Sequence, residues 1–98
     1  MEIKKAKNGS AMSIGVVGRL DTTTAPQLEK ELKESLDDVT ELTMDLSALD
    51  YISSAGLRVL LSAQKAMQKK GSMKVTGVNE TVMEVFEVTG FVDILNIE

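Results

Sequence analysis

Strand and helix patterns alternate along this chain, and the alternation limits the possible folds more than any other feature. Apolar residues alternate with polar ones over about Met12–Leu20, Glu41–Leu46 and Met73–Val78, as in strands. Between these segments, apolar residues recur at helical spacing over about Ala25–Leu36 and Ser54–Lys70. Two consecutive strand–helix–strand units favour parallel strands joined by right-handed crossovers. The sequence therefore predicts an α/β fold.

Each end of the chain adds further elements. Residues Ile3–Ala6 have strand character, and the Asn8-Gly9 pair after them is a strong hairpin turn, which predicts an antiparallel edge strand. Near the other end, Glu80–Val88 has helical spacing, and Phe91–Ile97 is an apolar segment that fits a strand or irregular structure. We expect one domain with a mixed sheet of four or five strands and helices that follow the strands.

Three segments carry signals of a helix start. Thr24 and Gln27 have the spacing of a capping box, with Thr24 as the N-cap, and Pro26 suits a first helical turn. Ser54 stands at or next to the N-cap of the second helix, and Asn79 is a good N-cap for the third. The helices are therefore expected to begin near these residues.

Composition excludes several classes of function. The 98 residues include 11 Lys+Arg and 15 Asp+Glu, a net charge of −4, and 3% are aromatic, which argues against nucleic-acid binding. Histidine and cysteine are absent, so a Ser-His-Asp hydrolase, a thiol nucleophile and a zinc site of His or Cys ligands are impossible within residues 1–98. No run has the length of a signal peptide or a membrane span, so we expect a cytoplasmic protein. We also expect no metal or other cofactor.

Several polar residues follow the strands at one edge of the expected sheet. We expect a loop over Ser47–Ile52 after the Glu41–Leu46 strand. Because the carboxyl ends of parallel strands share an edge, the following residues should lie near one another: Asp21, Asp45, Asp50, Ser53 and Ser54. Three carboxylates leave a magnesium or acid–base site open, although turn and loop roles for these residues are the favoured interpretation.

Ser54 is the most informative of these residues. It stands where the unpaired amides and the positive end of a helix dipole favour an anion, so a phosphate attached there would be stabilised. Gly56, in the same turn, would let another protein approach closely. The alternative is that Ser53 or Ser54 only caps the helix.

Three motifs along the chain resemble one family. The run from Asp45 to Leu61 (DLSALDYISSAGLRVLL) strongly resembles the signature of STAS domains, more narrowly that of bacterial anti-sigma factor antagonists. Gly18–Asp21 (GRLD) resembles the second marker of that family, and Val75–Val78 followed by Val85–Gly90 resembles the third. The resemblance covers essentially the whole chain and implies the same α/β order.

The resemblance also implies a function and its residues. It implies phosphorylation of Ser54 by an anti-sigma factor that is itself an ATP-binding serine kinase, with Asp21 beside the site supporting recognition. Several members have Asp where this chain has Ser53, which makes Ser53 the alternative acceptor. Unphosphorylated, the chain would bind the kinase and release a sigma factor, and a PP2C-type phosphatase would reverse the modification. The expected partner surface consists of Asp21, Thr22, Ser53, Ser54, Ala55, Gly56, Leu57 and Arg58.

Other functions remain open at this point. A phosphorylation-independent STAS subunit of a lipid-transport ABC complex would use the same fold as a scaffold. A domain severed from an anion transporter and an enzyme with a magnesium site at the Asp cluster are further alternatives. The favoured prediction is a monomeric binding protein that is not an enzyme and regulates transcription.

Overall fold

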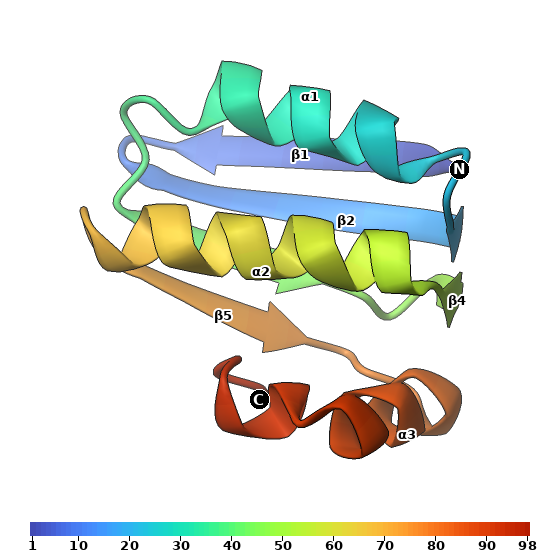
Figure 1. Ribbon diagram of the computed structural model, residues 1–98. Coiled ribbons are helices and arrows are strands. Elements are labelled where there is room, and N and C mark those ends of the chain that lie inside the picture. The colour runs from blue at the N-terminus through green and yellow to red at the C-terminus, as the bar shows by residue number, and fades with distance from the viewer.

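A mixed five-stranded sheet carries three helices in the computed structural model, which describes all 98 residues (Figure 1). Strand β1 pairs antiparallel with β2, and β2, β3 and β5 are parallel in the order β1-β2-β3-β5. The predicted α/β class is therefore confirmed. The elements are β1 (Glu2–Asn8), β2 (Ala11–Leu20), α1 (Ala25–Ser35), β3 (Glu41–Asp45), β4 (Leu49–Ile52), α2 (Ser54–Gln68), β5 (Ser72–Thr76), α3 (Glu80–Thr89) and a 3₁₀ turn (Phe91–Asp93).

Strand β4 corrects the expectation of a loop over Ser47–Ile52. Strand β2 extends beyond the end of β3, and Leu49–Ile52 pair in parallel with its free final residues. The register shifts between Gly18 and Arg19, which leaves Asp50 as an extra, bulged residue. Gly18 has φ of 95°, a conformation that glycine adopts readily. Four residues with a bulge show no alternation of apolar side chains, so the sequence carried no strand signal.

Helices α1 and α2 lie side by side on one face of the sheet (Figure 1). The core lies between them and the strands, where Ile14, Met44 and Val75 from the sheet and Leu28 and Leu60 from the helices are fully buried. All three helices lie within two residues of their predicted bounds. The arrangement places the amino ends of α1 and α2 at the same edge of the sheet, the edge where β2 and β4 end.

Helix α3 packs against β4, beyond the edge of the layer formed by α1 and α2 (Figure 1). Asn79 caps it as predicted, since its side chain accepts a hydrogen bond from the Val82 N–H at 2.9 Å. After the 3₁₀ turn the chain is irregular and ends with a single bridge between Ile97 and Val75. The Phe91–Ile97 segment is therefore irregular, the second of its two predicted forms.

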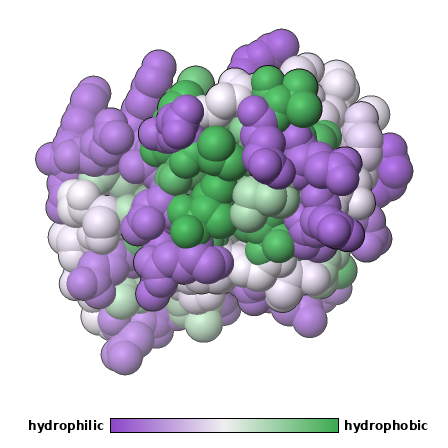
Figure 2. Space-filling view, turned by 90° about the horizontal axis from the view of Figure 1, so that it is seen from below, coloured by the Kyte–Doolittle hydropathy of each residue, from purple (hydrophilic) through white to green (hydrophobic).

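Hydrophobic surface gathers on the side of the molecule seen in Figure 2, which is viewed from below Figure 1. Val88 of α3 is 87% exposed, and Ile94, just beyond the 3₁₀ turn, is 43% exposed. Neither residue belongs to the edge at which α1 and α2 begin. None of the helices combines the length and the apolar character needed to cross a lipid bilayer.

Candidate functional site

The last residue of β2 and the N-cap of α2 are joined by a backbone hydrogen bond. The Ser53 N–H donates to the Leu20 carbonyl oxygen at 2.9 Å, because β4 runs parallel to β2 and ends beside it. Asp21 follows Leu20, and Ser54 follows Ser53. The predicted proximity of the loop after β2 to the start of α2 is therefore observed.

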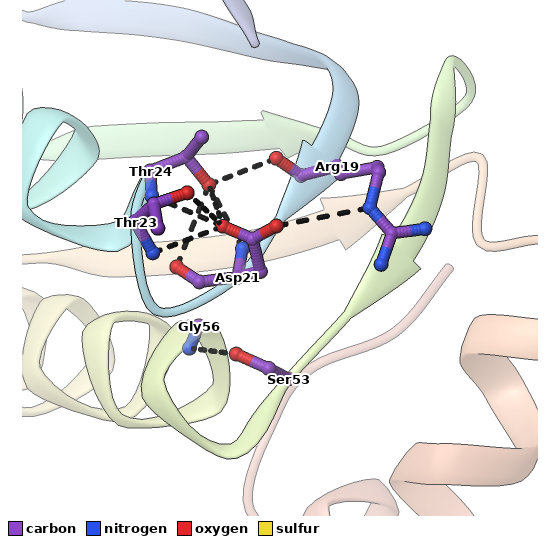
Figure 3. A network of polar contacts seen from close by, with 6 residues as sticks. All are labelled: Arg19, Asp21, Thr23, Thr24, Ser53 and Gly56. Carbon is purple, nitrogen blue, oxygen red and sulfur yellow. Dashed lines mark hydrogen bonds and ion pairs between the residues drawn. The ribbon is translucent and has the colours of Figure 1, made fainter.

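Asp21 organises the turn between β2 and α1 (Figure 3). Its Oδ1 accepts hydrogen bonds from the Thr23 N–H at 3.0 Å, the Thr23 hydroxyl at 2.7 Å and the Thr24 N–H at 3.2 Å. The other carboxylate oxygen lies 3.7 Å from the Arg19 Nε, and the Arg19 guanidinium in turn lies 4.3 Å from the centre of the Tyr51 ring. Asp21 thus has the turn role that its position predicted.

The hydrogen bonds at Asp21 also set its charge. The Thr23 hydroxyl has the largest effect and lowers the pKa of the Asp21 carboxyl below its ordinary value; desolvation opposes it, and the Thr24 and Thr23 amides lower the pKa further. Asp21 therefore carries a full negative charge at neutral pH. The turn between β2 and α1 therefore holds a fixed negative charge.

The predicted capping box at Thr24 does not form. Thr24 is the N-cap of α1, but its backbone is helical (φ −102°, ψ −22°) and its side chain makes no cap hydrogen bond. Instead its hydroxyl accepts from the Asp21 N–H at 2.8 Å and donates to the Arg19 carbonyl at 2.9 Å. The hydroxyl is engaged by the end of β2, and the first amide of α1, that of Ala25, instead donates to the backbone carbonyl of Asp21 at 2.8 Å.

Ser53 and Ser54 have different environments although they are neighbours. Ser53 is the N-cap of α2, with extended backbone (φ −102°, ψ 176°), and its hydroxyl accepts from the Gly56 N–H at 3.4 Å. Ser54 is the first residue of the 15-residue helix, is exposed, and its hydroxyl makes no hydrogen bond. The cap role that the sequence left open between the two serines belongs to Ser53, and the free hydroxyl is that of Ser54.

Gly56 faces the core rather than a partner, which corrects its expected role. A Cβ at this position would lie 2.7 Å from Leu20 Cγ and 2.9 Å from Ile52 Cγ1. Leu57 is buried as well, with 6% of its surface exposed. These two members of the expected partner surface hold α2 close to β2 and β4, and they are not available for direct contact.

The three aspartates expected to cluster do not converge. Asp45 pairs with Gly15, five residues before the end of β2 at Leu20, so about 16 Å of strand separates Asp45 from the turn that carries Asp21. The Ser47 amide and hydroxyl lower the pKa of the Asp45 carboxyl, and the Ser47 N–H donates to Asp45 Oδ1 at 3.0 Å. Asp50 is the exposed bulge residue of β4. No set of three or more Asp or Glu side chains is placed to hold a metal ion.

A groove of about 240 Å³ runs between the amino ends of α1 and α2. Three members of the expected partner surface line it: Thr22, Ala55 and Arg58. Sequence analysis missed the residues opposite and beside them, which include Pro26, Glu29 and Ser62. Helical spacing places Arg58 with Ala55 and Ser62 on one face of α2, but only the packing of α1 on α2 brings the two faces together.

A larger groove lies away from this edge. It has a volume of about 490 Å³ and opens near the amino ends of β3 and β5, between residues such as Ser13, Thr43 and Lys74. It holds no serine at a helix start and none of the candidate site residues expected from the sequence. The edge that carries Asp21, Ser53 and Ser54 remains the candidate site because exposed polar groups, a helix start and a groove coincide there.

The structure is thus a small α/β domain with an exposed serine hydroxyl, that of Ser54, at the start of α2. The chain belongs to the STAS domain family, whose family model matches residues 2–98.

Among curated proteins, the chain is similar to a putative anti-sigma factor antagonist, BtrV, of Bordetella bronchiseptica. They are 43% identical over 79 residues, which cover 79% of this chain and 68% of that protein. It is also 30% identical over 100 residues to the anti-sigma-B factor antagonist of Listeria monocytogenes, covering 100% of this chain and 87% of the relative.

Solved structures share the fold. The anti-sigma factor antagonist SpoIIAA in its unphosphorylated form matches with a TM-score of 0.85 and 17% identity, covering 99% of this chain and 88% of that one. SpoIIAA of Bacillus in the phosphorylated form matches with a TM-score of 0.77 and 16% identity, covering 99% and 91%. The predicted single-domain architecture, a mixed sheet with helices following the strands, is thus also that of these proteins.

Proposed function

We propose that this protein is an anti-sigma factor antagonist, a monomeric binding protein rather than an enzyme, whose binding is switched by phosphorylation of Ser54. The observation that carries the proposal is the exposed, unbonded hydroxyl of Ser54 at the first position of α2, beside an N-cap that Ser53 already supplies. The names of the two curated relatives support the regulatory role.

In the unmodified state the edge formed by the β2–α1 turn and the start of α2 binds an anti-sigma factor. The exposed residues Thr22, Ser54 and Arg58 contribute to that surface, together with the half-buried Asp21 and Ala55. Binding there displaces a sigma factor from the anti-sigma factor, which frees it for transcription. Ser53, Gly56 and Leu57 act from beneath by setting the position of α2.

The same partner, as an ATP-dependent serine kinase, modifies the site. Ser54 Oγ attacks the γ-phosphorus of ATP held by the kinase, a P–O bond to the serine forms, and the bond to ADP breaks. The hydroxyl proton passes to a base on the kinase, since this chain has no histidine and the Ser54 hydroxyl has no hydrogen-bond partner within it.

The phosphate changes binding through charge rather than through refolding. It adds a charge of about −1.5 to −2 at neutral pH. The start of a helix stabilises an anion by about 0.3–2 kcal/mol, so α2 tolerates the group. The partner surface, matched to a neutral hydroxyl and the Asp21 carboxylate, then meets added negative charge that it must desolvate. A coupling of about 1–3 kcal/mol lowers the affinity roughly 5–150-fold.

A PP2C-type phosphatase restores the binding state by removing the phosphate. Because sigma factors act on RNA polymerase, the cycle runs in the cytoplasm. The fold supports such a cycle, since SpoIIAA, which shares it, has been solved in unphosphorylated and phosphorylated forms.

The test uses the purified chain, ATP and the candidate kinase from the same genome, with peptide mass spectrometry as the readout. We expect phosphate on Ser54 in the wild type and in Ser53→Ala, and none in Ser54→Ala. Ser54→Ala should keep its affinity for the kinase, whereas Ser54→Asp should fold and bind more weakly. Phosphate uptake by Ser54→Ala at the wild-type level would refute the assignment of the acceptor, and equal affinity of Ser54→Asp would refute the switch.

A further inference from the structure

Arg58 is the cation nearest in sequence to Ser54, four residues further along α2. Both side chains are exposed. Residues at this spacing lie on one face of a helix, with Cβ atoms about 5–6 Å apart. Helical side chains lean toward the amino end, so a long side chain at the later position extends back over the earlier one. The guanidinium of Arg58 can therefore reach a group carried on the Ser54 oxygen.

Arg58 has no partner within the unmodified protein. The structure contains five ion pairs, and Arg58 belongs to none of them. The other arginine, Arg19, is engaged by Asp21 and by the Tyr51 ring. Glu29, the acidic residue across the groove from Arg58, is paired with Lys33 at 3.0 Å. Arg58 is therefore the arginine left free at the candidate site.

We infer that Arg58 is the intramolecular partner of a phosphate on Ser54. The inference rests on the proposed phosphorylation of that serine. A guanidinium presents several N–H donors in a planar fork, which matches two phosphate oxygens better than the single ammonium of lysine does. Phosphorylation would then act twice on the partner surface. It adds negative charge at Ser54, and it draws away the cation that the unmodified surface offers to an acidic group of the partner.

The inference is testable without a kinase. Phosphoserine is placed at position 54 by reassignment of a codon, in the full chain, and the second ionisation of the phosphate is followed by ³¹P NMR against pH. A nearby cation favours the dianion, so the midpoint in the wild type should lie about 0.15–0.4 pH unit below that in Arg58→Gln. Arg58→Lys should give an intermediate midpoint.

Lys65→Gln is the matched control. It removes one exposed, unpaired positive charge from the same helix. Lys65 lies 11 residues beyond Ser54, about 16 Å along the helix, which exceeds the screening length of about 8–10 Å at physiological salt. Its midpoint should equal that of the wild type.

Two results would overturn the pairing. One is a midpoint in Arg58→Gln that coincides with the wild type, and the other is an equal shift in Lys65→Gln, which would indicate a general effect of net charge. Either result leaves the kinase assay of Ser54 unaffected. Conversely, a failure of the kinase to modify Ser54 would refute the proposed function while the ³¹P comparison still decided whether Arg58 can hold a phosphate there.

Discussion

A Cβ atom on Gly56 would lie 2.7 Å from Leu20 Cγ, so the first turn of α2 packs directly on the last residue of β2. This close approach, together with the Ser53–Leu20 backbone hydrogen bond of 2.9 Å, fixes where α2 begins relative to Asp21. The position of the candidate acceptor, Ser54, relative to Asp21 is thus set by buried contacts.

Gly56→Ala should destabilise the protein although alanine is the better helix former. In the interior of a solvent-exposed helix, replacing glycine by alanine would raise the free energy of unfolding by about 1 kcal/mol. Here the added methyl meets Leu20 and Ile52, and overpacking of this kind costs about 1–3 kcal/mol. Urea denaturation measures the effect. Gly15→Ala is the control, because its nearest neighbour would be an ordinary 3.8 Å contact, and its midpoint should change little. If Gly56→Ala were as stable as the wild type, α2 would be able to move away from β2 to make room for the methyl group.

Ser53→Ala and Ser54→Ala should separate the two serines by stability. Ser53 caps α2 through the Gly56 N–H, although at a long 3.4 Å, so its loss should cost about 0.5–1 kcal/mol, in the lower part of the range for such caps. Ser54 bonds to nothing and is exposed, so Ser54→Ala should stay within about 0.5 kcal/mol of wild type. The same urea titrations check both. The reverse order of stabilities would contradict the assignment of the cap.

Asp21→Asn should make the free energy of unfolding depend less on pH in the acid range. Because the pKa of Asp21 is lowered in the folded protein, the unfolded chain binds more protons at acid pH, and the free energy of unfolding rises with pH. That contribution is complete above the ordinary aspartate pKa and is lost as pH falls from about 5 through the lowered folded value. The isosteric amide does not ionise, so the variant should be less stable at pH 7 and show a smaller further loss in acid.

Urea titrations at a series of acid pH values measure the effect of Asp21→Asn. The free energy of unfolding of this variant should still fall somewhat in acid, because Lys7 lowers the pKa of Asp38, and the Ser47 amide and hydroxyl lower that of Asp45. Asp50→Asn serves as the control, since the Asp50 carboxylate accepts no hydrogen bond, and its curve should follow the wild type. If Asp21→Asn lost stability in acid as much as the wild type does, the stability of the turn would not depend on the carboxylate charge.

Asn79 should stabilise the protein through two separate bonds. Its Oδ1 caps α3 at Val82, and its Nδ2 donates to the carbonyl of the buried Leu49 in β4 at 2.7 Å. Asn79→Ser keeps a capping oxygen but loses the link to β4, which should cost about 0.5–1.5 kcal/mol. Asn79→Ala loses both and should cost about 1–3 kcal/mol. Thermal and urea unfolding would report the difference, and equal costs would mean that the cap contributes nothing.

The sequence predicted the elements whose pattern is local. The helical spacing over Ala25–Leu36 and the cap at Asn79 each involve one helix and the residues that flank it, so periodicity and capping chemistry located the helices to within two residues. Strand β4 was missed because its pairing depends on the free end of β2 and on a bulge at Asp50. The capping box at Thr24 was wrong because the end of β2 competes for the same hydroxyl.

For the site, the sequence by itself determined which residues follow strands and which stand at a helix start, and parallel pairing then implied that Asp21 and Ser53–Ser54 are neighbours. Only the tertiary structure decided that Asp45 lies far along β2, that Gly56 faces Leu20, and that Ser53 rather than Ser54 is the cap. The physical reason is that local sequence sets the preferences of φ, ψ and side-chain polarity within a segment. The direction in which a given residue points depends on the register between strands and on the close packing of a helix against them.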